Sequence, residues 1–131
     1  MFKEIKLKSF TNEKGSLLPV EFKDIIPFEV KRTYFCYNNS PIRGSHCHLK
    51  EEEVFVLLHG KAKVRLHDGK TETIIELTPF ENGVYVANMI WHEIIDMSED
   101  SILLAFSSTN YNPNREDYIE DFQIFLDKVK S

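Results

Sequence analysis

The sequence predicts an all-β fold, a closed or double-sheet antiparallel barrel that ends in one C-terminal α-helix. Short runs of β-branched and aromatic residues are separated by turn residues at intervals of about 8 to 12 residues, the spacing of a sandwich or barrel. One run, 53–58, is apolar on both faces after its first residue, which is typical of an interior strand. Only the end of the chain changes to helical spacing.

Ten strands are expected before that helix. In chain order they cover 4–10, 16–22, 30–37, 44–49, 53–58, 61–67, 70–77, 83–86, 91–97 and 101–107. The clearest pair, 61–67 and 70–77, is joined by Asp68-Gly69, a strong signal for a two-residue hairpin loop. Ala62, Val64 and Leu66 alternate with charged residues, so this strand should bury one face and expose the other.

The C-terminal helix is expected to begin after Asn114, a good N-cap residue. Its apolar positions, at helical spacing, are Tyr118, Ile119, Phe122, Phe125, Leu126 and Val129. The chain therefore reads as a single domain, 1–131, with the barrel over about 1–110 and the helix over about 115–130.

Composition excludes several classes of protein. The 131 residues suffice for one domain, and 16 basic against 21 acidic residues give a net charge of −5, which argues against a nucleic-acid-binding surface. Two cysteines make no disulfide framework and the N-terminus does not resemble a secretion signal, so we expect a cytoplasmic protein. No apolar run approaches the roughly 20 residues that cross a bilayer, so we expect no membrane partner.

Two histidines and a glutamate carry the clearest chemical signal. His46 and His48 are two residues apart on a predicted strand and therefore share a face. Four residues separate His48 from Glu53, and six separate Glu53 from Gly60. This spacing resembles the first motif of the cupin superfamily, small jelly rolls whose barrel interior holds the active site.

His92 stands where the second cupin motif places its histidine, although Ala87 and Met89 replace the usual Pro and Gly. Cupins use this set in two ways. Three imidazoles and a carboxylate can bind a divalent transition ion. In metal-free members the imidazoles move protons instead, since a histidine pKa of about 6.5 suits that task near neutral pH. A polar patch without function is the remaining alternative.

An ordered set of motifs carries a closer resemblance. The motifs are Lys31-Arg32-Thr33-Tyr34, Arg43-Gly44-x-His46-x-His48-x-Lys50, Gly83-x-Tyr85-Val86 and Trp91-His92-Glu93. Together they resemble the cupin-fold sugar 3,4-ketoisomerases that act on dTDP-4-keto-6-deoxy-D-glucose. The resemblance implies a cofactor-free, metal-free isomerase, a homodimer, and a place in the synthesis of 3-amino-3,6-dideoxy sugars for surface glycans or glycosylated natural products.

The resemblance also implies residue roles. His48 would shuttle a proton between C3 and C4, His46 would orient it, polarise the keto oxygen or carry a second proton, and Tyr34 would exchange protons with the sugar oxygens. The expected substrate-binding residues are Arg43, Arg32, Lys50, Glu53, His92 and Trp91. Tyr85 and Phe35 are further candidates for stacking on a base or sugar.

Two histidines and one cysteine are expected to lie outside the site. His59 and His67 adjoin predicted turns and should lie at the surface. Cys47 lies between the two site histidines and should point the opposite way.

Three positions depart from the ketoisomerase pattern. Glu53 stands where those enzymes more usually have glutamine; a carboxylate there could raise the pKa of His48. It also completes a ligand set for a metal-dependent, dioxygenase-like cupin: His46, His48, Glu53 and His92. Lys14 resembles the basic residue of one subtype and Ile95 fits neither subtype, which leaves the C4 configuration of the product, gluco or galacto, open. A non-catalytic sugar-binding module is a third reading.

Overall fold

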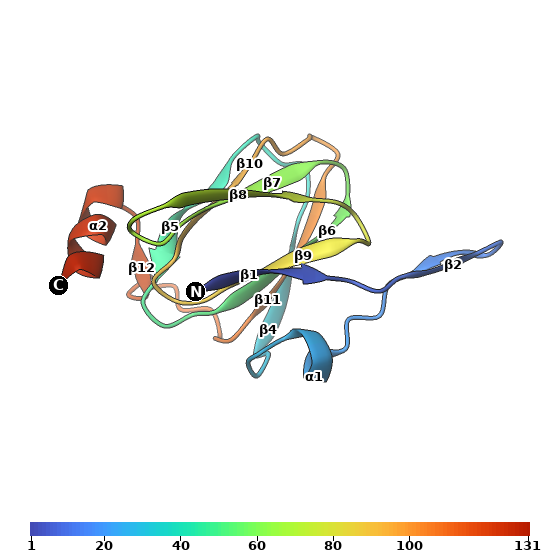
Figure 1. The fold of residues 1–131 in the computed structure, drawn as a ribbon, viewed down its shortest axis with the longest axis horizontal. Coiled ribbons are helices and arrows are strands. Elements are labelled where there is room, and N and C mark those ends of the chain that lie inside the picture. Colours follow the sequence, from blue (N-terminus) through green and yellow to red (C-terminus); the bar gives the residue numbers. More distant parts are fainter.

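The computed structural model describes all residues, 1–131, and folds them into two five-stranded antiparallel sheets that face each other (Figure 1). The sheet orders are β1-β9-β6-β11-β4 and β12-β5-β10-β7-β8. The strands are β1 (Phe2–Lys6), β2 (Phe10–Asn12), β3 (Gly15–Leu17), β4 (Arg32–Cys36), β5 (Arg43–His48), β6 (Glu53–His59), β7 (Ala62–His67), β8 (Glu72–Leu77), β9 (Asn82–Val86), β10 (Trp91–Ile95), β11 (Ile102–Ser107) and β12 (Tyr118–Ile119). The predicted all-β, cupin-like jelly roll is confirmed.

The main core fills the space between the two sheets. β6 lies between β9 and β11, and its residues from Glu53 to Leu57 are all buried, so the predicted interior strand is confirmed. On β7, Ala62, Val64 and Leu66 are buried while the intervening residues are half-buried, which confirms the predicted alternation. Each sheet thus contributes its inward side chains to one shared core.

The β7–β8 hairpin is confirmed, but its loop is longer than predicted. His67 pairs with Glu72, so four residues make the connection. The Asp68 carboxylate accepts hydrogen bonds from the backbone N–H groups of Lys70 and Thr71, both at 2.8 Å, and Gly69 adopts a φ of +103°. The side chain of Asp68 therefore stabilises a wider turn than the Asp-Gly pair alone would form.

The N-terminal segment differs from the prediction. β1 ends at Lys6 and pairs with β9, whereas β2 and β3 form a separate two-stranded hairpin that projects from the barrel (Figure 1). The predicted strand 16–22 stops at Leu17, and α1 (Phe22–Ile25) is a short helix. The ring of Phe22 packs edge-on against Phe106 at 5.3 Å, so tertiary contact favours a helical turn over the predicted strand.

The C-terminal helix begins later than predicted. α2 (Phe122–Lys130) is capped by Asp121, whose side chain accepts a hydrogen bond from the N–H of Ile124 at 3.0 Å. The expected start after Asn114 is wrong because Tyr118 and Ile119 pair with β5 as strand β12. Arg115 also adopts a φ of +56°, which a right-handed helix excludes.

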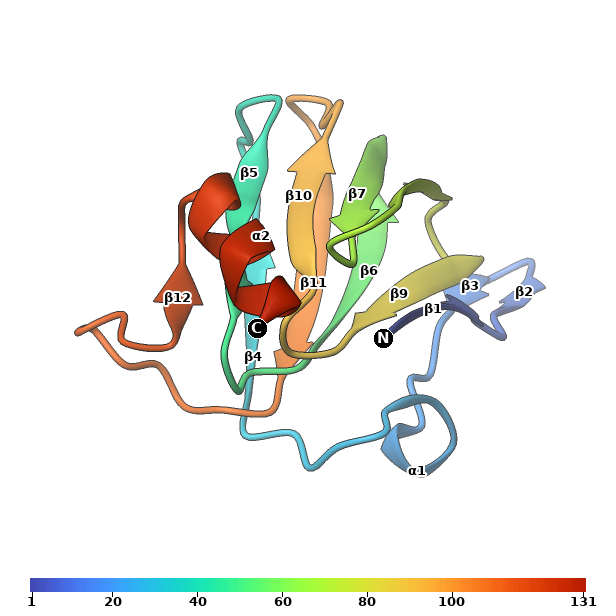
Figure 2. The same ribbon diagram turned by 60° about the vertical axis from the view of Figure 1, so that its left-hand side comes forward.

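Both sheets carry a second apolar layer on their outer faces. α2 lies over β5 and β10 (Figure 2) and buries one cluster: Cys47, Trp91, Ile119 and Phe125. The segment 18–30 covers the other sheet, where Ile26 of this segment packs with four buried residues of the sheet: Val54, Val56, Tyr85 and Phe106. No helix of the chain is long and apolar enough to cross a membrane.

Candidate active site

Three strands bring the predicted histidines and glutamate together inside the barrel. His46 and His48 come from β5, Glu53 from β6 and His92 from β10. The ring centroid of His46 lies 4.8 Å from those of both His48 and His92. These side chains line an open cavity of about 450 Å³, together with Arg32, Tyr34, Arg43, Phe55, Tyr111, Arg115 and Tyr118.

A β-bulge between β5 and β10 brings Arg43 to the face of the site histidines. His92 pairs with His46, but the next residue of β10, Glu93, pairs with Gly44, which leaves Ser45 unpaired. Gly44 and Ser45 both adopt left-handed backbone conformations, with φ values of +89° and +64°. Strict alternation would turn Arg43 away from the face of His46, and the extra residue lets Arg43 line the same cavity.

Glu53 connects three of the predicted site residues. Its Oε1 lies 3.1 Å from Nε2 of His48 and 3.6 Å from Nε2 of His92, and its Oε2 accepts a short hydrogen bond from the Tyr34 hydroxyl. Burial alone would raise the pKa of Glu53, but these contacts outweigh it and lower the pKa to about 2. Glu53 is therefore an anion at neutral pH, with its charge directed at two imidazoles.

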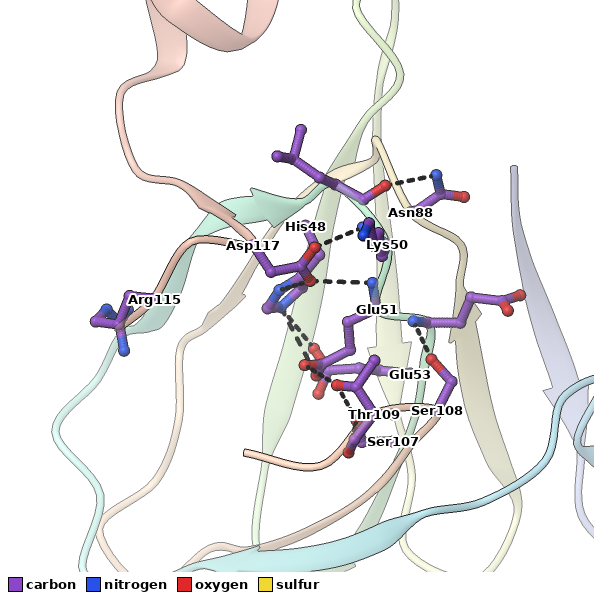
Figure 3. A network of polar contacts seen from close by, with 12 residues as sticks. His48, Lys50, Glu51, Glu53, Asn88, Ser107, Ser108, Thr109, Arg115 and Asp117 are labelled. Carbon is purple, nitrogen blue, oxygen red and sulfur yellow. Dashed lines mark hydrogen bonds and ion pairs between the residues drawn. The ribbon is translucent and has the colours of Figure 1, made fainter. Parts of the chain in front are cut away.

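His48 lies between carboxylates. Its Nδ1 is 3.4 Å from Oδ2 of Asp117, and Nε2 is 3.9 Å from Oε2 of Glu51 in addition to the Glu53 contact (Figure 3). These are ion-pair distances without hydrogen-bond alignment, so both buried ring nitrogens lack a well-directed partner. Burial lowers the pKa of His48, but the carboxylates together outweigh burial, so the pKa lies above its usual value.

His46 and His92 behave in the opposite way. Burial, and then the neighbouring imidazoles, lower the pKa of His46 to about 3. Burial also lowers the pKa of His92, whose Nδ1 lies 3.1 Å from the carbonyl oxygen of Ile90. The cavity therefore holds two neutral imidazoles beside one, His48, that readily takes a proton.

Tyr34 remains a phenol. Burial, followed by the charge of Glu53, raises its pKa well above 10. The guanidinium of Arg32 lies 5.6 Å from the Tyr34 ring and donates a hydrogen bond to Glu51 at 3.1 Å. Tyr34 and Arg32 therefore form one wall of the cavity, as the Arg-x-Tyr spacing predicted.

Four predicted contact residues lie outside this cavity. Trp91 is buried beneath α2, where Nε1 donates to Glu93 at 3.1 Å and the ring packs against Phe122, because it points opposite to His92 on β10. Lys50 is exposed and lines a neighbouring pocket instead. Tyr85 belongs to the outer cluster of the other sheet, and Phe35 is 61% exposed. Trp91, Tyr85 and Phe35 are therefore not placed to stack on a ligand in the histidine cavity, whereas Lys50 stays a candidate through the neighbouring pocket.

The residues expected outside the site do lie outside it. Cys47 is buried beneath α2, on the face opposite the histidines. His59 is exposed and pairs with Asp100 at 3.4 Å. His67 is half-buried rather than fully exposed, and its Nδ1 accepts a hydrogen bond from the N–H of Gly69 at 2.9 Å.

The segment 108–118 supplies cavity residues that the sequence did not assign to the site. Tyr111, Arg115 and Tyr118 line the cavity, and Asp117 contacts His48. The Arg115 guanidinium lies 3.9 Å from the centroid of the Tyr118 ring and pairs with Glu120. The sequence predicted a loop and the start of a helix over this stretch. Its residue spacing therefore gave no sign that it would pair with β5 and enter the site.

The neighbouring pocket, about 360 Å³, adjoins the histidine cavity. It shares three of the cavity's lining residues, Arg32, Arg115 and Tyr118. Asp117, Lys50 and Glu51 also line it. The two hollows therefore form one continuous surface that carries three guanidinium or ammonium groups beyond Arg43.

The same four interior side chains fit a divalent transition ion. One ligand atom from each of His46, His48, Glu53 and His92 lies within 4.8 Å of every other. Three imidazoles and one carboxylate are ligands that suit iron, nickel, copper or zinc. A bound ion would supply Lewis-acid polarisation of an oxygen.

The chain is similar to known proteins along nearly its whole length. It is 35% identical over 125 residues to a TDP-4-oxo-6-deoxy-alpha-D-glucose-3,4-oxoisomerase of Aneurinibacillus thermoaerophilus, covering 94% of this chain and 88% of the relative. A 3,4-ketoisomerase from Helicobacter canadensis superposes with a TM-score of 0.90 at 32% identity, covering 99% and 98% of the two chains.

A sugar 3,4-ketoisomerase from Thermoanaerobacterium thermosaccharolyticum, solved as a complex with TDP, gives a TM-score of 0.89 at 34% identity, covering 98% and 94%. Residues 2–130 match the family described as "FdtA: WxcM-like, C-terminal". With a match of this length, and relatives of this identity and coverage, the chain belongs to the WxcM-like, C-terminal (FdtA) family.

Proposed function

We propose that this chain is an isomerase that converts dTDP-4-keto-6-deoxy-D-glucose to a dTDP-3-keto-6-deoxy-D-hexose. The observation that carries the proposal is the environment of His48, an imidazole held among carboxylates in a cavity that also contains a phenol and two neutral imidazoles. The named relatives, a 3,4-oxoisomerase and 3,4-ketoisomerases, support the same reaction class. The reaction needs no oxidant, because one carbon loses the electrons that the other gains.

The chemistry requires two proton movements. Neutral His48 removes the C3 proton, the C3–H electron pair forms a C3–C4 double bond, and the former keto oxygen at C4 becomes an enediolate oxygen. His48 then returns its proton to C4. The hydroxyl proton of O3 must reach O4, so that the O3–H electron pair forms the C3–O3 double bond while the C3–C4 double-bond pair takes the proton at C4. Tyr34, bonded to Glu53, is the group that can carry the hydroxyl proton. Atoms and electrons balance without a further reactant.

His46 and the arginines complete the proposed site. A neutral His46 can donate a hydrogen bond to the oxygen that becomes negative, since a neutral imidazole keeps its remaining N–H. Arg32 and Arg43 line the cavity, and a guanidinium matches the paired oxygens of a pyrophosphate. His92 and Glu53 are buried lining residues of the cavity, 3.6 Å apart. Because Trp91, Tyr85 and Phe35 lie outside this cavity, Tyr111 and Tyr118 are aromatic surfaces available there to a base or sugar.

The test is an assay with dTDP-4-keto-6-deoxy-D-glucose followed by NMR of the product, with and without a 3-aminotransferase. The wild-type chain is expected to form the 3-keto sugar, and the spectrum assigns its C4 configuration. His48→Asn should abolish turnover, whereas the matched variant His59→Asn, at an exposed histidine paired with Asp100, should keep it. Full activity of His48→Asn would overturn the assignment of the base.

A metal-dependent enzyme is the second candidate, and the fit of the four ligand atoms favours it. Metal analysis of the purified chain distinguishes the two. One transition ion per chain, lost together with activity in His46→Ala, would support metal chemistry. Full isomerase activity after chelation would support the proton-transfer mechanism, and tight sugar binding without turnover would indicate a sugar-binding module.

The proposed enzyme is a cytoplasmic homodimer in the synthesis of 3-amino-3,6-dideoxy sugars. Several large apolar side chains are exposed in the single chain, among them Phe10, Leu17 and Phe35. Phe10 and Leu17 are paired directly across the β2–β3 hairpin, so two large apolar side chains lie together at the surface, as is common at interfaces. Light scattering is expected to give twice the chain mass of 15.4 kDa, and a single-chain mass at all concentrations would contradict the dimer.

A further inference from the structure

We propose that Asp117 is a positioning residue that keeps a proton on Nδ1 of His48, so that Nε2 is the nitrogen that exchanges protons with the substrate. The inference rests on the proposed function and concerns a residue outside the motifs. Asp117 immediately precedes β12, and Tyr118 of β12 pairs directly with His48. Figure 3 shows the Asp117 carboxylate beside the His48 ring.

Asp117 is held firmly in place. Its Oδ1 accepts a hydrogen bond from the N–H of Lys50 at 2.7 Å, and its Oδ2 accepts one from the N–H of Glu51 at 3.0 Å. Its backbone carbonyl accepts a third from the N–H of Leu49 at 2.8 Å. These bonds join the segment before β12 to the turn that follows β5. The carboxylate is thereby fixed 3.4 Å from Nδ1 of His48.

The two nitrogens of His48 face different spaces. Nε2 points toward Glu53, which lines the histidine cavity, whereas Nδ1 points toward Asp117, which lines the neighbouring pocket and not the cavity. A substrate in the cavity would therefore approach the ring from its Nε2 side. For Nε2 to accept a proton, the single proton of the neutral ring must sit on Nδ1.

Glu53 opposes that arrangement. Its Oε1, 3.1 Å from Nε2, attracts the ring proton toward the cavity side, where the proton would block the base. The Asp117 carboxylate attracts it toward Nδ1. Glu51 adds negative charge near Nε2 but is itself bonded to Arg32 and Thr109 at 3.1 and 2.8 Å, which offsets part of its pull. Asp117 is the only carboxylate that the structure places on the Nδ1 side.

Asp117→Asn tests the proposal because a neutral amide lacks the negative charge that attracts the ring proton to Nδ1, which leaves the pull of Glu53 toward Nε2 unopposed. We expect kcat to fall at least about tenfold, with KM changed far less, since a carboxylate that orients a catalytic imidazole acts mainly on the chemical step. Asp100→Asn is the matched control: its carboxylate also lies 3.4 Å from a histidine, His59, but at the surface, and kcat should stay unchanged.

Nitrogen-15 NMR of labelled histidine gives a readout that needs no substrate and no variant. At a pH where His48 is neutral, the wild-type ring is expected to carry its proton on Nδ1, and Asp117→Asn should move it to Nε2. A wild-type ring protonated on Nε2 would overturn the proposal even if Asp117→Asn failed to fold. If the wild-type chain lacked isomerase activity, the proposed function would fail while this measurement still decided the role of Asp117.

The Glu53→Gln background gives a second, independent check. With the competing negative charge removed, the Nδ1 proton depends less on Asp117, so Asp117→Asn should reduce kcat by a smaller factor there than in the wild-type background. Equal factors in the two backgrounds would contradict the competition between the two carboxylates.

Discussion

The charge state of each imidazole in the cavity follows from where the carboxylates lie. His46 contacts other imidazoles, whereas His48 is within 4 Å of Glu51, Glu53 and Asp117. Burial disfavours the charged form of both rings, and only His48 has enough negative charge nearby to reverse that effect. Neighbouring histidines can therefore serve as a proton carrier and as neutral hydrogen-bond donors.

Replacing Glu53 by glutamine should move the acid limb of the kcat/KM profile to lower pH. His48 acts as a base only when unprotonated, and Glu53 helps to raise its pKa, so removing the carboxylate lowers that pKa. The measurement is kcat/KM against pH for Glu53→Gln. Glu52→Gln is the control, because Glu52 is bonded to Tyr85 outside the cavity. An acid limb that stays in place, or moves to higher pH, would contradict this account of His48.

Tyr34→Phe should lower kcat by about 10²- to 10⁴-fold, the usual contribution of one general acid–base group, with little change in KM. The phenol is the group proposed to move the hydroxyl proton, and phenylalanine keeps the ring while losing that proton. Tyr85→Phe is the matched control, since Tyr85 also donates to a glutamate, Glu52, but in the outer cluster. Equal kcat values for Tyr34→Phe and the wild-type chain would remove Tyr34 from the mechanism.

At the scale of elements, the β5–β10 bulge connects folding to the site. A Cβ on Gly44 would lie 3.1 Å from the carbonyl oxygen of His92 in addition to the left-handed strain at its φ of +89°. Gly44→Ala should therefore destabilise the fold by about 1–3 kcal/mol. It should also reduce activity by displacing His92.

Gly15→Ala provides the comparison for Gly44→Ala. Gly15 also adopts a positive φ, of +126°, but a Cβ added there would meet no other atom within 4 Å. Chemical denaturation and turnover measured on both variants separate backbone strain from contact with the site. If Gly44→Ala and Gly15→Ala lost the same fraction of activity, the contact between residue 44 and His92 would not explain the loss in Gly44→Ala.

α2 should matter for stability rather than for chemistry. Phe125 is fully buried between the helix and the second sheet, against Trp91. Phe125→Ala should lower the free energy of unfolding by about 3–5 kcal/mol, the cost of removing a buried aromatic side chain. Ile124→Ala, at a 58% exposed position of the same helix, should cost far less. Thermal denaturation compares them, and similar melting temperatures would contradict the packing role of Phe125.

Local patterns predicted those elements whose pattern and packing agree. The apolar run of β6 fits only an interior strand, and the alternation of β7 fits only a strand with one buried face. Strand geometry also placed His46 and His48 on one face. The start of α2 could not be placed, because the apolar spacing of Tyr118 and Ile119 fits a helix as well as an edge strand, and pairing with β5 decides between them. Asp117 was missed for the same reason.

At the scale of the whole molecule, the two sheets separate an apolar core from a polar cavity within one barrel. The apolar cluster fills most of the space between the sheets, while the histidines, Glu53 and Tyr34 occupy the open part. The chain carries a net charge of −5, yet Arg32, Arg43 and Arg115 converge on this opening. A locally basic entrance on an acidic protein suits one small anionic substrate better than a polyanion.

The buried histidines should make the fold less stable in mild acid. Between pH 6.5 and the folded pKa of about 3, His46 binds a proton in the unfolded chain but not in the folded one, so stability falls as pH falls through this range. His92, whose pKa is also lowered, acts in the same direction, and His48, whose pKa is raised, opposes them. Glu53, with a folded pKa of about 2, adds its loss only at lower pH, below its ordinary value of 4.5.

His46→Asn should therefore flatten the dependence of stability on pH. Urea denaturation at about pH 7 and about pH 5 is expected to show a smaller drop in the midpoint for His46→Asn than for the wild-type chain, because these pH values bracket the titration of an unfolded histidine. His59→Asn, at an exposed histidine, should keep the wild-type drop. If His46→Asn lost as much stability as the wild-type chain between the two pH values, burial of a neutral His46 would not be a source of acid sensitivity.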